Sequence, residues 1–529
     1  MSDGSTVRHD EALWQQPHNP WVIALVVTMA TFMEVLDTSV ANVSLPHIAG
    51  NLSAGVDEST WVLTSYLVSN AVVLPLSGWL SERFGRKRFY MSCVGLFTGS
   101  SLLCGFAPSL GWLVFFRVLQ GAGGGGLQPS EQAILADTFP PAKRGMAFAV
   151  YGMAVVVAPA LGPTLGGWIT DNFTWRWIFF VNIPVGILSL LLTSRLISDP
   201  PYLKNRRRAG VKIDYIGFGL IALGLGMLQV VLDKGQREDW FETPYIRVFT
   251  VIFVTALILA VIWELRVKEP VVELRLFKDR TFLMGNVMLF VVGFVLYSST
   301  LLLPQYAQEL MGYTAEQSGK LISPGGFAVM MLMPVVGFLV THYDARKIIT
   351  VGFVLVGAGL FSMTRFNLQV DFQTMMWARV LQASGLAFLF VPINTAAYAF
   401  LPREKNNAAS GLINLSRNIG GSVGISFVTT LLARRAQFHQ TVLVSHLSNY
   451  NWHFLGAVNT LAHSFAAAGT SAWMATRQGY AVFGRMVVQQ SSLLAYIDNF
   501  HVLALICLGL IPLTFLMKKS KTGGPVAVH

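Results

Sequence analysis

The chain has 529 residues, of which 53% are hydrophobic and only 12% are charged. Soluble domains carry about twice that charged fraction, so the composition excludes an ordinary soluble protein and favours a polytopic membrane protein. The formal net charge is +11, but the basic residues stand in short gaps between apolar runs, which indicates control of membrane topology rather than nucleic-acid binding.

Fourteen apolar runs are long enough to cross a bilayer as helices, which takes about 20 mostly apolar residues each. The polar first 20 residues lack a basic stretch before the first run, so we expect no cleaved signal peptide. In chain order we expect spans near residues 21–42, 60–80, 89–107, 112–136, 146–169, 176–196, 214–232, 246–264, 281–303, 318–340, 348–366, 374–399, 409–433 and 498–517.

Lysine and arginine gather in the even-numbered gaps between these runs. The second gap holds Arg83, Arg86 and Lys87, whereas the first holds Asp57 and Glu58 and no basic residue. Because Lys and Arg tend to stay on the cytoplasmic side, we expect a multi-pass protein of the cytoplasmic (inner) membrane with both termini in the cytoplasm.

The thirteenth gap, about residues 434–497, is the one long gap. It contains four histidines without a tight pair, which disfavours a metal site there, and the three cysteines show no metal-binding or disulfide spacing. We therefore expect no metal, and we interpret this gap as an amphipathic segment lying over the outer surface.

A repeat relates the first six spans to the last six. RVLQ at 117–120 returns at 379–382, and FPPAKRGMA at 139–147 aligns with LPREKNNAA at 401–409, both 262 residues apart (379 − 117 = 262). Parallel six-span repeats predict an all-α transporter of two six-helix bundles, here with two extra central helices, and substrate near the midplane between the bundles.

This repeat defines the expected domains. A cytoplasmic tail (1–20) precedes the first bundle (21–200), and a linker with the two extra helices (201–280) leads to the second bundle (281–517) and a short cytoplasmic tail (518–529). We expect no soluble catalytic domain, and we find no clustered His or carboxylates typical of a membrane-embedded enzyme.

Ionisable residues inside spans are costly and normally face an interior cavity. Glu34, Asp37 and Thr38 share one face of the first span, and the helical rise places Asp37 and Arg117 at a similar depth, ~22–24 Å from the inner side. Asp37 is the first candidate for the coupling proton and Glu34 the second, with Arg117 tuning them. The alternative is a permanent Asp37–Arg117 ion pair that only aligns helices.

Further polar groups within the spans predict the lining of a substrate cavity. GAGGGG at 121–126 lacks a following Lys-Ser or Lys-Thr, so we interpret it as a close helix contact rather than a nucleotide-binding loop. The expected lining comprises Glu34, Thr38, Gln120, Glu131, Arg379, Gln382, Asn414 and Arg417.

Several motifs resemble those of one transporter family over nearly the whole chain. LDTSVANVSLPHI at 36–48, GWLSERFGRKRF at 78–89 and APALGPTLGG at 158–167 resemble motifs of the major facilitator superfamily, although Glu82 replaces the usual Asp. WRWIFFVNIPVG at 175–186 and NLSRNIGGSVG at 414–424 are more specifically similar to the fourteen-span drug:proton antiporters of the EmrB/QacA type.

The resemblance implies proton-driven efflux of lipophilic or amphipathic compounds, without a cofactor, by a multidrug export permease. It also implies a periplasmic membrane-fusion adaptor and an outer-membrane channel as partners in double-membrane bacteria. The alternative that stays open is a proton-coupled importer or facilitator of a small metabolite on the same fold. Drugs, uncouplers, dyes and fatty acids fit the composition equally.

The resemblance also assigns two groups of residues. In a cytoplasmic gate, Glu82 would face the positive N-terminus of a helix in the other half, and an arginine would pair with Asp137. An antiporter motif in the fifth span would seal the cavity against proton leak. The gate comprises Gly78, Glu82, Arg83, Gly85, Arg86, Lys87 and Asp137, and the antiporter motif comprises Gly162, Pro163, Gly166 and Gly167.

Overall fold

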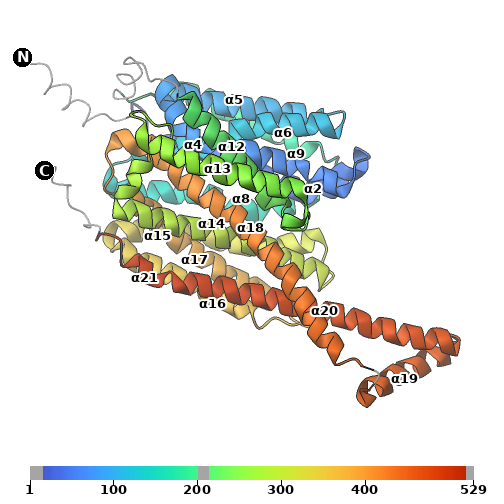
Figure 1. Cartoon of the computed structure of the whole chain (residues 1–529). Coiled ribbons are helices and arrows are strands. Elements are labelled where there is room, and N and C mark those ends of the chain that lie inside the picture. The colour runs from blue at the N-terminus through green and yellow to red at the C-terminus, as the bar shows by residue number, and fades with distance from the viewer. Residues whose placement is uncertain (1–15, 201–213, 449, 520–529) are drawn as a thin grey trace, which may run out of the picture.

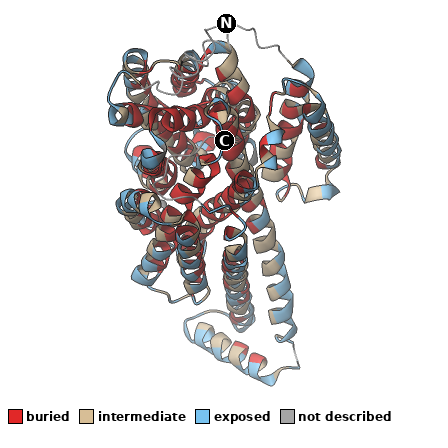
Figure 2. Ribbon diagram, turned by 90° about the vertical axis from the view of Figure 1, so that its left-hand side faces the viewer, coloured by how far each residue is buried: buried red, intermediate tan, exposed pale blue. Residues whose placement is uncertain are grey.

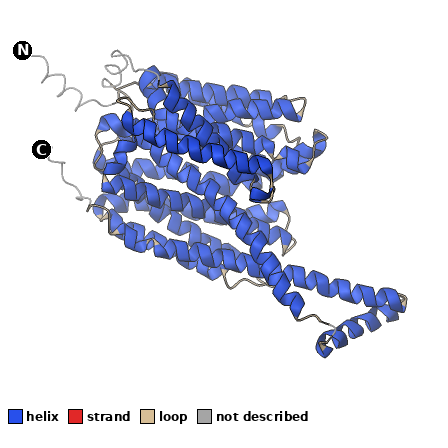
Figure 3. Ribbon diagram, viewed as in Figure 1, coloured by secondary structure: helices blue, strands red, loops and turns tan. Residues whose placement is uncertain are grey.

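The computed structural model describes residues 16–200, 214–448 and 450–519, and within these ranges it contains helices and no strand (Figure 3). Most of the two expected tails, and the basic start of the linker, lie outside the described residues. The long helices run roughly parallel, with their ends gathered at two faces (Figure 1).

The two halves of the chain form two groups of helices, with two more between them in sequence. The first half contains α2 (Pro20–Asn51), α4 (Trp61–Phe84), α5 (Arg86–Gly105), α6 (Leu110–Gly124), α7 (Leu127–Thr138), α8 (Arg144–Asn172), α9 (Trp177–Phe180) and α10 (Asn182–Leu196). The second half contains α14 (Arg280–Glu309), α15 (Ala315–His342), α16 (Ala345–Met363), α17 (Phe372–Tyr398), α18 (Asn406–Ser445), α20 (Ala472–Gly509) and α21 (Ile511–Thr514). Between them stand α12 (Tyr215–Lys234) and α13 (Pro244–Arg266).

Short elements complete the chain. They are α3 (Val56–Ser59), α19 (Trp452–Ala467) and four 3₁₀ turns, η1 (Pro141–Lys143), η2 (Trp240–Glu242), η3 (Leu274–Lys278) and η4 (Arg403–Lys405). Side chains cap several helix starts: the carboxylate of Asp279, for example, accepts hydrogen bonds from the backbone N–H groups of Thr281 and Phe282. The α4–α5 turn needs Gly85, whose φ of +90° is rare for any other residue.

Eleven helices in the described ranges are long and apolar enough to cross a membrane. Three further segments lie among them with more glycines and polar residues: α5, the α6–α7 pair and α18 (Figure 1). The eleven and these three make up the fourteen expected spans. The prediction of an all-α polytopic membrane protein is confirmed.

Glycines let the helices of the first half approach closely, as GAGGGG predicts. A Cβ atom added at Gly123 would lie 2.6 Å from the backbone nitrogen of Phe97 on α5, and one at Gly125 would lie 2.6 Å from the carbonyl oxygen of Asn70 on α4. Real Cβ atoms do not approach so closely, so these contacts require the small residue. The stretch ends α6 at Gly124 and begins α7 at Leu127.

The two halves meet face to face along α8 and α15, and along α4, α7 and α18. Gln132 Nε2 on α7 donates to Asn394 Oδ1 on α17 at 3.1 Å, and these residues are 262 positions apart (394 − 132 = 262). That separation is the offset of the sequence repeat, so equivalent residues of the two repeats touch each other. The contact marks the pseudo-two-fold axis between the halves.

The extra helix α12 contacts both halves, chiefly α4 of the first half and to a lesser extent α18 of the second. α12 lies along α4 and packs against α13 (Figure 1). At its C-terminal end the Asp233 carboxylate accepts a hydrogen bond from Thr64, and the buried Lys234 ammonium donates to Thr60. The C-terminal end of α12 is therefore fixed to the start of α4.

The long thirteenth gap differs from its expectation. Instead of lying over the outer surface, α18 and α20 continue beyond the bundle, and α19 joins them in a projecting hairpin whose surface is mostly exposed (Figures 1 and 2). α18 has 40 residues, or ~60 Å by helical rise, about twice the ~30 Å hydrocarbon core. Its base is held by Asp498 on α20, which accepts from Arg435 Nε at 2.5 Å and contacts His439 Nε2 at 2.7 Å.

Candidate functional site

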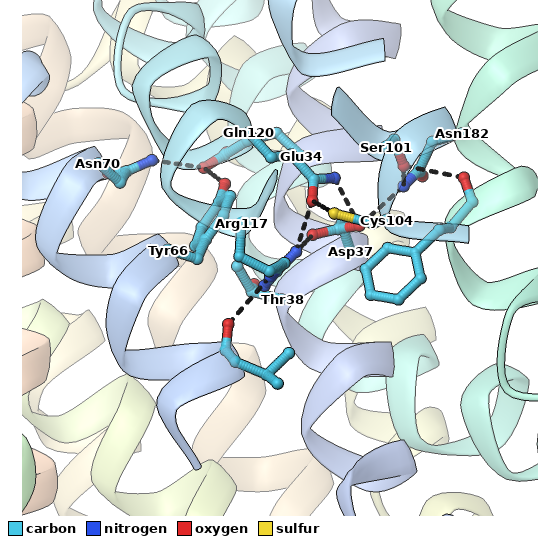
Figure 4. A network of polar contacts seen from close by, with 12 residues as sticks. Glu34, Asp37, Thr38, Tyr66, Asn70, Ser101, Cys104, Arg117, Gln120 and Asn182 are labelled. Carbon is cyan, nitrogen blue, oxygen red and sulfur yellow. Dashed lines mark hydrogen bonds and ion pairs between the residues drawn. The ribbon is translucent and has the colours of Figure 1, made fainter. Parts of the chain in front are cut away.

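A buried ion pair joins the first and fourth spans. Arg117 Nη1 on α6 lies 2.5 Å from Asp37 Oδ2 on α2, and both side chains are fully buried (Figure 4). The other Asp37 oxygen accepts from Asn182 Nδ2 at 2.8 Å and Gln120 Nε2 at 3.1 Å. Asp37 is thus held by one cation and two amides, and these contacts offset part of the cost of burying its carboxyl group.

The two RVLQ segments build the same local geometry. Arg117 Nη1 donates to Gln120 Oε1 at 2.8 Å, and Arg379 Nη1 donates to Gln382 Oε1 at 2.5 Å. The partner on the first span of each half differs, because Gln120 Nε2 reaches Asp37 whereas Gln382 Nε2 reaches Ser299 Oγ at 2.9 Å. The equivalent positions therefore hold an acid in one half and a hydroxyl in the other.

Arg379 is consequently a buried cation held by neutral groups. Its Nη1 donates to Ser299 Oγ at 3.0 Å and its Nη2 to Thr300 Oγ1 at 3.0 Å, while Nε has no hydrogen-bond partner among the described residues. No carboxylate within the described ranges lies within 4 Å of it. Arg117 thus has a carboxylate partner and Arg379 has neutral partners, so the two equivalent arginines need not have the same role.

Glu34 occupies a neutral polar pocket one turn before Asp37. Its Oε1 accepts from Tyr66 Oη at 3.0 Å and Asn70 Nδ2 at 3.2 Å, both on α4 (Figure 4). Its Oε2 accepts from Gln128 Nε2 on α7 at 2.6 Å. Glu34 is fully buried, and no cation of the described chain lies within ion-pair distance of it. Its charge is therefore far less compensated than that of Asp37.

A polar network continues from Glu34 across to the second half. Gln128 Oε1 accepts a hydrogen bond from Arg417 Nη2 on α18, and Arg417 Nη1 donates to Tyr151 Oη on α8 at 2.8 Å. The Tyr151 hydroxyl lies 2.9 Å from Asn414 Oδ1, and Asn414 Nδ2 donates to Gln132 Oε1 at 2.8 Å. Residues of α2, α7, α8 and α18 thus form one buried network between the halves.

Two of the expected cavity residues lie at the edge of this network. Glu131 is fully buried on α7, where its Oε1 accepts from Thr28 Oγ1 at 2.5 Å and its Oε2 has no hydrogen-bond partner among the described residues. Thr38 donates to the carbonyl oxygen of Val35 in its own helix at 2.8 Å. The Thr38 hydroxyl group therefore donates its hydrogen bond within its own helix. Glu131, in contrast, has one carboxyl oxygen that could accept a hydrogen bond from a further group.

Several of the expected gate residues join the two halves at one end of their interface. Arg86 Nη1 lies 2.6 Å from Asp137 Oδ2, and Arg86 Nε donates to Asn407 Oδ1 of α18 at 2.9 Å. Asn406 Nδ2 donates to Asp137 Oδ1 at 2.7 Å, so both members of the pair also bind the second half. A Cβ atom at Gly78 would lie 3.1 Å from Ala408 Cα, which brings α4 against the first turn of α18.

The other gate residues lie around this contact. Glu82 and Arg83 are half-buried in the last turn of α4, and Gly85 makes the turn that follows. Lys87 reaches sideways rather than across, because its Nζ donates to the carbonyl oxygen of Ser194 at 2.6 Å, at the end of α10 in the same half. Lys87 thus ties α5 to α10.

The proline-containing fifth span is fitted to the first span. Pro163 has no N–H to bond the carbonyl oxygen of Pro159, and Ser39 Oγ on α2 supplies a hydrogen bond to that oxygen at 3.2 Å. A Cβ atom at Gly162 would collide with the Ser39 side chain, and one at Gly166 would lie 3.1 Å from the carbonyl oxygen of Val40. Gly167, the last glycine of the motif, makes no such close contact, since nothing lies within 4 Å of a Cβ atom added there.

We expect Gly162→Val to destabilise the protein, whereas Gly167→Val should have nearly the melting temperature of the parent chain. Overpacking typically costs roughly 1–3 kcal/mol, and Ser39 cannot move away without losing its bond to the Pro159 carbonyl. Thermal unfolding of the purified protein in detergent measures the difference. Equal melting temperatures for the two variants would contradict the contact described above.

Some network residues escaped the sequence expectations. These residues have neutral side chains, so they do not stand out in an apolar span as a charged residue does. They are Tyr66, Asn70, Gln128, Tyr151 and Asn182. Gln128 and Gln132 could nevertheless have been predicted to join the network. They lie beside Glu131 within one apolar span, and buried amides need hydrogen-bond partners. The partners themselves come from distant parts of the chain.

The described residues offer no group of three or more His, Cys, Asp or Glu side chains arranged to hold a metal ion. The histidine of the hairpin base, His439, contacts Asp498 and so belongs to a structural contact. The chemistry of the site is therefore that of charges, amides and hydroxyls in a buried network.

Residues 27–425 match the Major Facilitator Superfamily. The chain is 37% identical over 431 residues to "Multidrug export protein EmrB" of Escherichia coli (strain K12), covering 81% of this chain and 83% of that protein. It is 37% identical over 501 residues to "Fatty acid resistance protein FarB" of Neisseria gonorrhoeae, covering 94% and 96%.

Among solved structures, the proton:xylose symporter XylE bound to 6-bromo-6-deoxy-D-glucose superposes with a TM-score of 0.58. The match covers 93% of this chain and 96% of that one at 14% identity, so it shows a common fold.

Proposed function

The chain belongs to the major facilitator superfamily, and on this premise we propose that it exports lipophilic or amphipathic compounds across the inner membrane in exchange for protons. It is a secondary transporter rather than an enzyme. The observation that carries antiport is Glu34, a buried carboxyl held by neutral groups in the centre of the network between the halves. Multidrug export and fatty acid resistance in the names of the relatives support the substrate class.

Transport into inside-out membrane vesicles tests this proposal. An exporter accumulates a lipophilic fluorescent dye when the vesicle lumen is acidified, because the lumen corresponds to the outside of the cell. An importer or facilitator on the same fold, the second candidate, would instead release preloaded dye from the lumen under the same gradient.

We assign the coupling proton to Glu34 and a mainly structural role to the Asp37–Arg117 pair. A carboxyl that changes its charge during a cycle needs an environment that tolerates both states, and neutral donors and acceptors provide one. Asp37 faces Arg117 at 2.5 Å, which stabilises only its ionised form. Glu131, with one unpartnered oxygen, is assigned to substrate contact beside Glu34.

We assign the contacts of Arg86 and Asp137 with the second half to a gate, and we assign the end of the bundle at which they lie to the cytoplasmic side. Arg86, Asp137 and Asn407 join the halves at the end of the bundle where α2 begins and α21 ends (Figure 1). Lys and Arg gather at this same end, which supports its cytoplasmic location. In this state the route to the cytoplasm is closed.

We assign the projecting hairpin to contact with a periplasmic adaptor. Residues 434–497 contain no Asp or Glu but four arginines and four histidines, so the hairpin suits an acidic protein surface. The hairpin also exposes Trp452 and Trp473, and aromatic side chains are enriched at interfaces. An adaptor outside the membrane would meet this projection first.

Co-purification tests the adaptor contact. Arg477→Glu with Arg485→Glu reverses two exposed charges of the hairpin and should reduce recovery of a co-expressed adaptor. Arg365→Glu, an exposed charge at the outer end of α16, is the matched control. Equal recovery with both variants would remove the hairpin from the adaptor interface.

A further inference from the structure

Gln128 joins a carboxyl of the first half to an arginine of the second half. Its Nε2 donates to Glu34 Oε2 at 2.6 Å, and its Oε1 accepts from Arg417 Nη2. An ionised carboxylate only accepts hydrogen bonds and a guanidinium only donates them, so the two neighbours dictate the orientation of the amide. The side chain is almost fully buried, which keeps water from replacing either bond.

Arg417 lacks a direct counter-charge. No carboxylate within the described ranges lies within 4 Å of it, and its other partners are the Tyr151 hydroxyl at 2.8 Å and Asn418 Oδ1 at 3.4 Å. An arginine buried inside a span is costly without compensation. The negative charge in its network is that of Glu34, which reaches Arg417 through the Gln128 amide.

We propose that Gln128 transmits the charge state of Glu34 to Arg417 and so keeps the cytoplasmic side closed until Glu34 takes up a proton. This rests on the proposed function, in which Glu34 carries the coupling proton. Ionised Glu34 polarises the amide, and hydrogen bonds to charged groups are about twice as strong as neutral ones. A protonated Glu34 removes that polarisation, and the hold of Gln128 on Arg417 weakens.

The direction of this effect matches the transport cycle. Arg417 stands on α18, whose first residues, Asn406 and Asn407, bind the gate pair Arg86 and Asp137. Releasing Arg417 therefore loosens the helix that closes the cytoplasmic side. A proton taken from outside would permit inward opening, and an ionised Glu34 would oppose it, which suppresses return of the empty transporter without a proton.

Other titratable groups face Glu34 and belong to the same electrostatic environment. They are Asp37 on α2, Tyr66 on α4, Glu131 on α7, Tyr151 on α8, Tyr297 on α14 and Arg417 on α18. Asp37 is neutralised by Arg117 at 2.5 Å. Among the described residues, Gln128 is the one that hydrogen-bonds both Glu34 and Arg417.

Distance measurements across the cytoplasmic side test the proposal. Spin labels at Ala142→Cys and Glu404→Cys, both exposed, report opening, and the three native cysteines are buried. In the parent chain the inward-open fraction should rise about tenfold as the pH falls through the titration of Glu34. Gln128→Leu should raise that fraction at high pH and remove most of its pH dependence.

Gln132→Leu is the matched control. It lies one turn further along α7 and also bonds the second half, with Asn394 at 3.1 Å and Asn414 at 2.8 Å, but it hydrogen-bonds no carboxyl group of the described residues. Its loss should raise the inward-open fraction equally at every pH. Glu34→Gln combined with Gln128→Leu should match Glu34→Gln alone.

The proposed link from Glu34 through Gln128 to Arg417 (the bridge) is overturned if Gln128→Leu keeps the pH dependence of the parent chain. It is also overturned if Gln132→Leu removes that pH dependence equally. A parent chain whose label distances do not respond to pH overturns it as well. Dye transport in vesicles separates this from the proposed function, because a chain that opens with falling pH but moves no dye retains the bridge and loses the antiport assignment.

Discussion

Glu34→Gln is expected to abolish proton-driven efflux while leaving the protein folded. Glutamine keeps the size of the side chain and its carbonyl oxygen, so it still accepts from Tyr66 or Gln128, but it neither binds nor releases a proton. Efflux driven by a pH gradient should fall at least tenfold, and dye binding should lose its pH dependence over the same range.

Transport in proteoliposomes with an imposed pH gradient measures this effect. Glu316→Gln is the control, since this exposed acid at the start of α15 pairs with Lys320 at 2.6 Å, and such surface pairs contribute little. Undiminished uphill efflux by Glu34→Gln would exclude Glu34 as the proton carrier and return Asp37 to first place.

Removing either charge of the Asp37–Arg117 pair is expected to cost far more stability than removing both. Asp37→Asn leaves the Arg117 guanidinium buried without a counter-charge, which typically costs roughly 3–5 kcal/mol. The double variant Asp37→Asn/Arg117→Gln leaves no unpaired charge, so its melting temperature should recover much of the loss.

Arg379→Gln provides the comparison for this prediction. Arg379 occupies the equivalent place in the second half with hydroxyl and amide partners, so its removal strands no opposite charge. Thermal unfolding in detergent should therefore show a smaller change for Arg379→Gln than for Arg117→Gln. A larger loss for Arg379→Gln would show that the ion pair is not what distinguishes the two halves.

The sequence predicted the fold through charges and repetition. The apolar runs indicated fourteen spans, and the 262-residue offset indicated two related six-helix bundles with two extra helices, because these signals depend on residue types along the chain alone. The same logic placed Arg117 and Asp37 at one depth, and the structure brings them together. It ranked Asp37 first as the proton carrier and kept a permanent Asp37–Arg117 pair as the alternative, because it could not see the neighbours of each carboxyl.

The network around Glu34 lay beyond such reasoning. Gln128, Tyr151 and Arg417 meet from three helices, and neutral amides and hydroxyls are common in spans for many reasons.

The projecting hairpin was missed for another reason. Residues 434–445 continue the helix of α18 without a breaking residue, but the apolar content that marks a span ends before them.

The Gln132–Asn394 contact also bears on how such a chain arises. If two identical halves once paired about a two-fold axis, each residue on that axis would face its own copy. A carboxylate or a guanidinium would repel itself there, whereas an amide carries a donor and an acceptor and can bond to another amide. Glutamine and asparagine at this place are what a fused homodimer would leave behind, and they let the two halves diverge elsewhere, as at Asp37 and Ser299, without losing their register.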